Sequence, residues 1–83
     1  MNIYVGSLDY KVNEDDLRGV FEVYGTVSSV QIIKDKMSGR SKGFGFVVMA
    51  NDDEALKAIK ELDGSILESR EVVVNEAKPK RRY

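Results

Sequence analysis

The chain has 83 residues, of which 42% are hydrophobic and 33% are charged, as in one small globular domain. It contains no cysteine and no histidine, which excludes disulfides and thiolate or imidazole metal sites and argues against an enzyme or a bound cofactor. No stretch reaches about 18 consecutive apolar residues, and the N-terminus lacks a basic signal segment, so we expect a cytoplasmic protein that does not enter a membrane.

The formal net charge of −1 conceals an uneven distribution. Residues 31–50 carry four basic side chains and one acidic side chain, and residues 78–83 carry four basic side chains and no acidic one. The acidic residues lie mainly in 9–22 and 51–76. Charge patterning by segment matters more than the sum, so the two basic segments leave a nucleic-acid ligand open beside the simpler interpretation of solvated surface charges.

The first predicted element is a strand over residues 2–6. Side chains alternate between the two faces of a strand, so Ile3 and Val5 predict a buried face, and Tyr4 points to the more polar side. Residues 7–12 then connect this strand to a helix.

Asn13 is the predicted N-cap of the first helix, because acidic residues fill the following turn and Asp16 lies three positions later. Apolar residues then repeat with the i, i+3, i+4, i+7 spacing of one helical stripe: Leu17, Val20, Phe21 and Tyr24. We expect Gly25 to end this helix at the C′ position.

Residues 27–34 are rich in β-branched side chains and predict a second strand, followed by a loop over 35–41. Residues 41–49, SKGFGFVVM, predict a third strand with two different faces. One face carries Gly43, Gly45, Val47 and Met49, and the other carries Lys42, Phe44, Phe46 and Val48. Bare glycines permit close packing, so we expect a helix to lie over the glycine face.

The second half repeats this layout. Asn51 is the predicted N-cap of a second helix, with Glu54 at the capping-box position and Gly64 as the stop. The helical stripe is made of Ala55, Ala58, Ile59 and Leu62.

A turn at 68–70 leads to a last predicted strand over 71–77, and Pro79 disfavours further pairing. We therefore expect one domain over residues 1–78 and a short basic tail over 79–83.

The order strand, helix, strand, strand, helix, strand predicts an α+β fold, the ferredoxin-like βαββαβ sandwich, with a four-stranded antiparallel sheet and two helices on one face. Right-handed crossovers place both helices on the same face. Tyr4, Phe44 and Phe46 are then left on the open face. Three aromatic side chains on an open sheet face indicate a binding surface.

These residues also resemble a known family. Residues 42–49, KGFGFVVM, resemble the RNP octamer of the RNA recognition motif, and residues 3–8, IYVGSL, resemble the family's hexameric RNP motif. Residues 70–77, REVVVNEA, are similar to the last strand of small bacterial and plant glycine-rich-type RNA-binding proteins. The chain departs from the pattern at Met49, where the octamer usually ends in an aromatic residue, and in having KPKRRY where a glycine-rich tail would follow.

The resemblance implies a monomeric single-stranded RNA-binding module, with single-stranded DNA as a further ligand, that serves as an RNA chaperone or post-transcriptional regulator without catalysis. It implies that Tyr4 and Phe44 each stack on a base and that Phe46 packs against the sugars. Lys42 and Arg40 are expected to reach phosphates. The remaining implied site residues lie on the second strand and at the end of the last strand: Gln31, Asn75, Ala77 and Lys78. Ile33 is expected to share the open face with Gln31.

Some alternatives stay open. Tyr10 could extend the stacking surface or pack across the first loop, and it is left outside the predicted site; Lys34 and Lys36 are interpreted as solvated charges. A protein-interaction module on the same fold is the main alternative function. An acylphosphatase-like enzyme would need an arginine in a phosphate-binding loop after the first strand, and residues 7–12 offer only Lys11.

Overall fold

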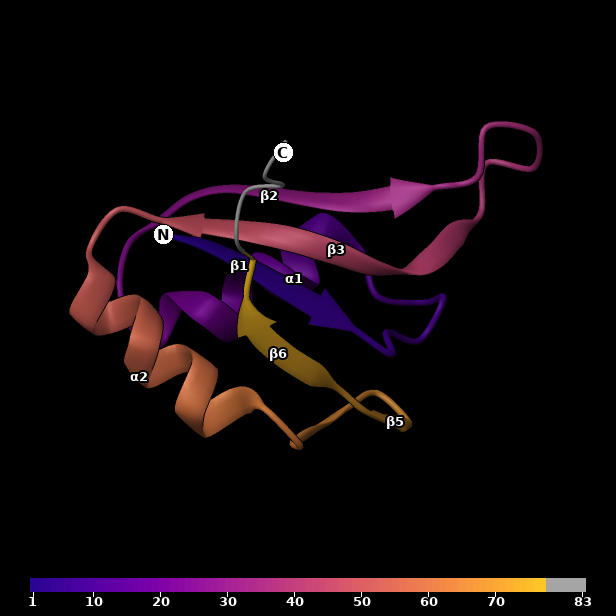
Figure 1. Ribbon diagram of the computed structural model, residues 1–83. Coiled ribbons are helices and arrows are strands. Elements are labelled where there is room, and N and C mark those ends of the chain that lie inside the picture. Colours follow the sequence, from indigo (N-terminus) through magenta and orange to yellow (C-terminus); the bar gives the residue numbers. More distant parts are fainter. Residues whose placement is uncertain (78–83) are drawn as a thin grey trace, which may run out of the picture.

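The elements follow one another in the order expected from the sequence, with one small hairpin added before the last strand (Figure 1). The computed structural model describes residues 1–77, so Lys78 and the expected tail lie outside the described residues. The helices and strands are β1 (Asn2–Gly6), α1 (Glu14–Glu22), β2 (Val27–Lys34), β3 (Ser41–Met49), α2 (Asp52–Leu62), β4 (Ile66–Leu67), β5 (Arg70–Glu71) and β6 (Val73–Glu76).

Four strands form one antiparallel sheet in the spatial order β2-β3-β1-β6. Helices α1 and α2 lie against one face of this sheet, and no described element covers the other face (Figure 1). The ferredoxin-like βαββαβ sandwich predicted from the sequence is therefore confirmed. Within the described part of the chain, neither helix has the length and apolarity needed to cross a bilayer.

The hydrophobic core lies between the sheet and the two helices. The sheet contributes alternate strand residues, as expected from the period of two. The buried sheet residues are Ile3, Val5, Val27, Ile32, Val47, Met49 and Val74, and the buried helical residues are Leu17, Phe21, Ala55, Ala58 and Leu62. Leu8, Val12 and Val72 join the core from the connecting segments. This arrangement leaves the alternate residues of the same strands on the open face.

Helix α1 begins as expected and ends early. Asn13 Oδ1 accepts a hydrogen bond from Asp16 N (2.8 Å), and Asp16 Oδ2 accepts one from Asn13 N (3.2 Å), which completes a capping box. The helix ends at Glu22, so the expectation that Gly25 terminates it is wrong. Gly25 does not adopt a left-handed φ; instead, the Glu54 side chain fills the space that a Cβ at Gly25 would need.

Helix α2 has the predicted ends but only half of the predicted capping box. Asn51 Oδ1 accepts from Glu54 N (2.9 Å), and Gly64, at φ 83°, takes the C′ position after Asp63. The Glu54 carboxylate accepts from Thr26 N (3.3 Å), so it joins α2 to the segment before β2.

The last strand begins later than expected, at Val73 and not at residue 71. Arg70 and Glu71 pair with β4 in a separate two-stranded hairpin. The backbone of Val72 explains the break: its N–H donates to Ser65 O (2.9 Å), and its carbonyl accepts from Gly64 N (2.8 Å). These bonds tie Val72 to the end of α2 in place of β1, although its side chain stays in the core.

The two glycines of β3 make room for backbone, not for a helix as expected. A Cβ at Gly45 would collide with the carbonyl oxygen of Gln31 on β2. Gly43, at φ 85°, offers its carbonyl to Leu8 N (2.8 Å). The glycines thus bring β2 and the β1–α1 loop close to β3, where the β2–β3 register is also irregular.

Candidate nucleic-acid interface

Three aromatic side chains form one cluster on the open face. Tyr4 projects from β1, and Phe44 and Phe46 project from β3, with ring centroids 5.9 to 6.3 Å apart. These are distances at which aromatic rings attract one another. The Tyr4 and Phe44 rings are the nearest to parallel, at 32°, whereas Phe46 stands at 64° to Tyr4 and at 88° to Phe44. The cluster therefore offers two similarly oriented faces beside an upright third ring.

The strand register explains why these side chains meet. Phe46 lies opposite Gln31 on one side and Tyr4 on the other, and Tyr4 lies opposite Asn75. Residues directly opposite one another share a face of the sheet. Gln31, Phe46, Tyr4 and Asn75 thus form one row across all four strands. We call this row together with Phe44 the aromatic platform.

Gly6 determines where the Tyr4 ring lies. A Cβ at Gly6 would be 2.9 Å from two carbons of the Tyr4 ring, closer than side chains approach. The ring therefore lies along its own strand over Gly6, which it helps to bury. In the sequence, Gly6 reads only as the last residue of a predicted strand, and nothing local signals its effect on the ring.

A hollow of about 270 Å³ adjoins the aromatic platform. It brings Lys42 together with Tyr4 and Phe44, as the sequence predicted. It also contains Arg70, which comes from β5 and was expected only as a turn residue. The hairpin that carries Arg70 was not predicted, so its arrival beside the platform could not be foreseen.

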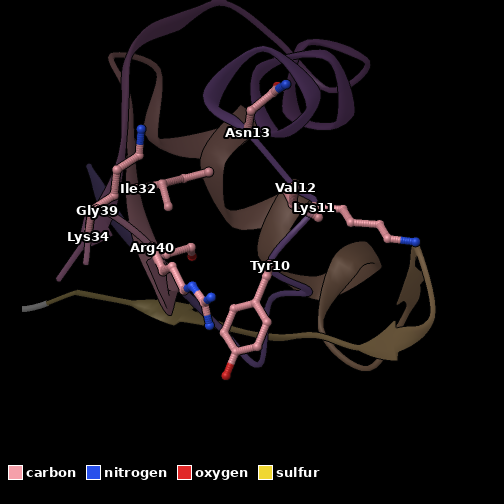
Figure 2. Close-up of a pocket in the computed structure, with 9 residues that line it drawn as sticks. Tyr10, Lys11, Val12, Asn13, Ile32, Lys34, Gly39 and Arg40 are labelled. Atoms are coloured by element: carbon pink, nitrogen blue, oxygen red, sulfur yellow. The ribbon is translucent and has the colours of Figure 1, made fainter.

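Other predicted residues lie farther away or have fewer free groups. Arg40 is not in the hollow: it lines a larger neighbouring cavity together with Tyr10 (Figure 2). The N–H of Ala77 donates to Asn2 O (2.8 Å), so it is not free to contact a ligand. Ile33 is partly buried on β2, and Lys78 lies outside the described residues.

Two carboxylates order the loops beside the interface. Asp9 accepts hydrogen bonds from Lys11 N (2.9 Å) and Ser69 Oγ (2.8 Å), which lower the pKa of its carboxyl and tie the β1–α1 loop to the β4–β5 hairpin. Asp35 accepts from Met37 N (2.8 Å) and Ser38 N (3.2 Å), which lower its pKa and order the β2–β3 loop. The backbone of both loops is therefore held in a defined conformation.

The residues of the platform and its hollow offer two kinds of noncovalent contact, stacking on rings and attraction to cations. The described residues contain no group of three or more acidic side chains placed to hold a metal ion. The half-buried rings of the uncovered face can stack on planar groups, and the adjacent cations can attract anions. Planar groups joined by anions match the bases and phosphates of a nucleic acid.

Comparisons with known proteins agree with this geometry. The family model described as the RNA recognition motif matches residues 3–73. RbpB of Nostoc sp. (strain PCC 7120) is 49% identical over 80 residues, which are 96% of this chain and 78% of that protein. A crystal structure of RNA Binding Protein PG1 has a TM-score of 0.93 at 45% identity and covers 99% of both chains. The structure of the Rna15 RRM with bound RNA (GU) has a TM-score of 0.84 at 26% identity, covering 94% of this chain and 83% of that one.

Proposed function

The chain belongs to the RNA recognition motif family, and on that premise we propose that its aromatic platform binds single-stranded RNA. The observation that carries the proposal is the pair of rings of Tyr4 and Phe44, 6.1 Å apart on the uncovered face. Nucleotides stacked in a duplex rise by only about 3.4 Å per step. Bases on these two rings would therefore be unstacked from each other, which favours a single strand over a duplex.

Each platform residue has a proposed role. Tyr4 and Phe44 stack on successive bases, and each stack is worth roughly 1–3 kcal/mol. Phe46 packs against the sugars, and Lys42 contacts a phosphate. Arg70, which lines the same hollow as Lys42, supplies a second cation.

Polar groups at the edges of the platform give it a modest ability to distinguish bases. Gln31 and Asn75 end the row across the sheet, and both are exposed. Their amides can donate and accept hydrogen bonds with base edges. We include Ala77, through its carbonyl oxygen, and Lys78, which follows it in the chain.

In the proposed organisation, residues 1–78 form the binding module and residues 79–83 form a basic tail. The protein acts as a monomer in the cytoplasm, as an RNA chaperone or post-transcriptional regulator, and catalyses no reaction. The absence of cysteine leaves no disulfide that would need an oxidising compartment. Single-stranded DNA is a further ligand, because stacking does not require a 2′-hydroxyl.

The test is a fluorescence-anisotropy titration at fixed salt with a panel of short RNA and DNA oligomers. We expect wild type to bind single-stranded RNA and the Phe44→Ala, Phe46→Ala double variant to keep its circular dichroism spectrum but lose most binding. Leu56→Ala is the matched control, because this half-exposed apolar residue lies on α2, away from the platform. Equal affinities of wild type and double variant would contradict stacking, and binding of proteins but of no oligomer would favour an interaction module.

A further inference from the structure

A second cavity lies next to the aromatic platform. It measures about 440 Å³ and lies between the β1–α1 loop and the facing ends of β2 and β3 (Figure 2). Its walls include Tyr10, Lys11, Ile32, Lys34 and Arg40. Tyr10 also lines the hollow that contains Tyr4 and Phe44, so the two spaces adjoin at this residue.

Tyr10 is held outward by the structure of its own loop. Leu8 and Val12, on either side of it, are almost completely buried, whereas 70% of Tyr10 is exposed. Between these two anchors, the Asp9 carboxylate accepts from Lys11 N (2.9 Å), and Val12 N donates to Asp9 O (3.0 Å). The ring therefore does not pack across the loop, which was one of the two possibilities left open by the sequence. The backbone that carries Tyr10 is thus fixed before binding, which lowers the entropy lost when the ring receives a ligand.

The walls of the second cavity are positively charged. Lys11, Lys34 and Arg40 line it, and no carboxylate is among the described residues that do so. The nearby Asp35 is occupied by the backbone of its own loop, and Glu14 Oε2 accepts from Ile32 N (3.3 Å). The two ion pairs among the described residues lie elsewhere, at Met1–Asp52 and Arg18–Glu22. The cations of the cavity are therefore available to an anion.

The directions of the side chains distinguish these cations. In Figure 2, the guanidinium of Arg40 extends toward the side of the cavity on which the Tyr10 ring lies, while Lys11 extends away from both. Arg40 is thus the cation best placed to act with Tyr10. Its planar guanidinium can hold a phosphate through two parallel hydrogen bonds.

We infer that the second cavity is a further nucleotide site for the same RNA strand, with a base on the Tyr10 ring and the adjoining phosphate on Arg40. This inference rests on the proposed function, because the strand reaches the cavity from the aromatic platform. A strand that leaves Phe44 through the shared hollow meets Tyr10 next. The module therefore holds three or more nucleotides, of which two lie on the platform.

The experiment compares a uridine dinucleotide with a uridine tetranucleotide by NMR titration, which measures weak as well as tight binding. Tyr10→Ala should lower the affinity for the tetranucleotide by about 5-fold to 150-fold, the range for loss of one base–aromatic stack. The affinity for the dinucleotide should stay within about twofold of that of wild type. Tyr10→Phe should bind both as wild type does. Arg40→Ala should weaken binding of the tetranucleotide more than binding of the dinucleotide, whereas Lys36→Ala, which removes an exposed cation of the neighbouring loop that does not line the cavity, should weaken neither.

The inference is overturned if Tyr10→Ala leaves the tetranucleotide unchanged, or if it weakens both oligomers equally, while wild type binds both. Failure of wild type to bind either oligomer would instead refute the proposed function, and the inference with it. Tyr10 is largely exposed, so its replacement should not unfold the domain, and an unchanged thermal midpoint checks this.

Discussion

At the scale of single residues, the position of Tyr4 depends on neighbours in two directions. Across the sheet, it lies between Phe46 and Asn75, which share its face. Along its own strand, the ring lies over Gly6. Gly6 has no side chain to contact a ligand, yet it determines the position of the Tyr4 ring, which can contact one.

Gly6→Ala tests this dependence. The new Cβ would be 2.9 Å from the Tyr4 ring, so the ring must move off its position. We expect RNA affinity to fall toward that of Tyr4→Ala, a loss of up to roughly 1–3 kcal/mol, with the fold retained. Gly19→Ala is the control, because nothing lies within 4 Å of its Cβ. Wild-type affinity of Gly6→Ala beside a weak Tyr4→Ala would contradict the argument.

A second residue-scale prediction concerns Asp9, whose pKa lies below its ordinary value of 3.8 chiefly because Lys11 N and then Ser69 Oγ donate to it. Ser69→Ala removes one donor, so the pKa of Asp9 should rise but stay below 3.8. Because the pKa of Asp9 is lower in the folded state than in the unfolded state, the ionised carboxylate stabilises the fold at any pH above the unfolded-state pKa. This stabilisation is lost as the pH falls through the folded-state pKa. NMR titration of the Asp9 carboxyl carbon gives the pKa in wild type and in Ser69→Ala, and Asp35 is the internal control. An unchanged pKa of Asp9 would show that the hydrogen bond from Ser69 is not formed in solution.

At the scale of elements, the sequence predicts those helix and strand ends that depend on neighbouring residues and fails at those that depend on distant contacts. Both N-caps and the Gly64 stop depend on a few neighbouring residues, and all three were predicted. The environment of Gly25 and the β4–β5 hairpin depend on more distant partners: the Glu54 side chain lies beside Gly25, and the backbone of Val72 bonds to Gly64 and Ser65. Periodicity within a segment does not report such long-range contacts.

The glycines of the chain give a matched pair of stability predictions. Gly45→Ala should destabilise the domain by about 1–3 kcal/mol, because its Cβ would collide with the backbone of β2 at Gln31. Gly19→Ala, in the open middle of α1, should stabilise it by up to about 1 kcal/mol. Urea denaturation measures both; a Gly45→Ala protein as stable as wild type would mean that β2 and β3 are not so closely apposed.

At the scale of the whole molecule, charge is divided between the two sides of the sheet. Helix α1 carries four acidic residues and one basic residue, and α2 carries four acidic and two basic residues. On the open side, Lys42 and Arg70 line the hollow beside the platform. A molecule with this distribution attracts a polyanion to its open face even though its net charge is −1.

Salt dependence tests this division. Lys42→Ala should reduce the slope of the logarithm of RNA affinity against the logarithm of salt concentration by about 0.7, the value for one phosphate contact with a single strand. Lys57→Ala removes the same charge from α2 and should leave the slope unchanged. Anisotropy titrations at four salt concentrations give the slopes, and equal slopes for the two variants would mean that RNA does not distinguish the faces.

The candidate site divides in the same way as the fold into predictable and unpredictable parts. Tyr4, Phe46 and their row follow from strand alternation and from the order of the strands. Arg70 and Tyr10 do not, because an unpredicted hairpin brings one to the hollow and buried anchors turn the other outward. Sequence alternation places side chains on strands, whereas the geometry of hairpins and loops depends on tertiary contacts.

If the protein binds RNA as proposed, RNA bases lie on the rings of the open face. An isotope-labelled sample bound to a short uridine RNA tests it through intermolecular nuclear Overhauser effects. We predict effects between base protons and the ring protons of Tyr4 and Phe44, and between sugar protons and Phe46. Unchanged ring signals, with shifts confined to the amides of α1 and α2, would contradict the claim.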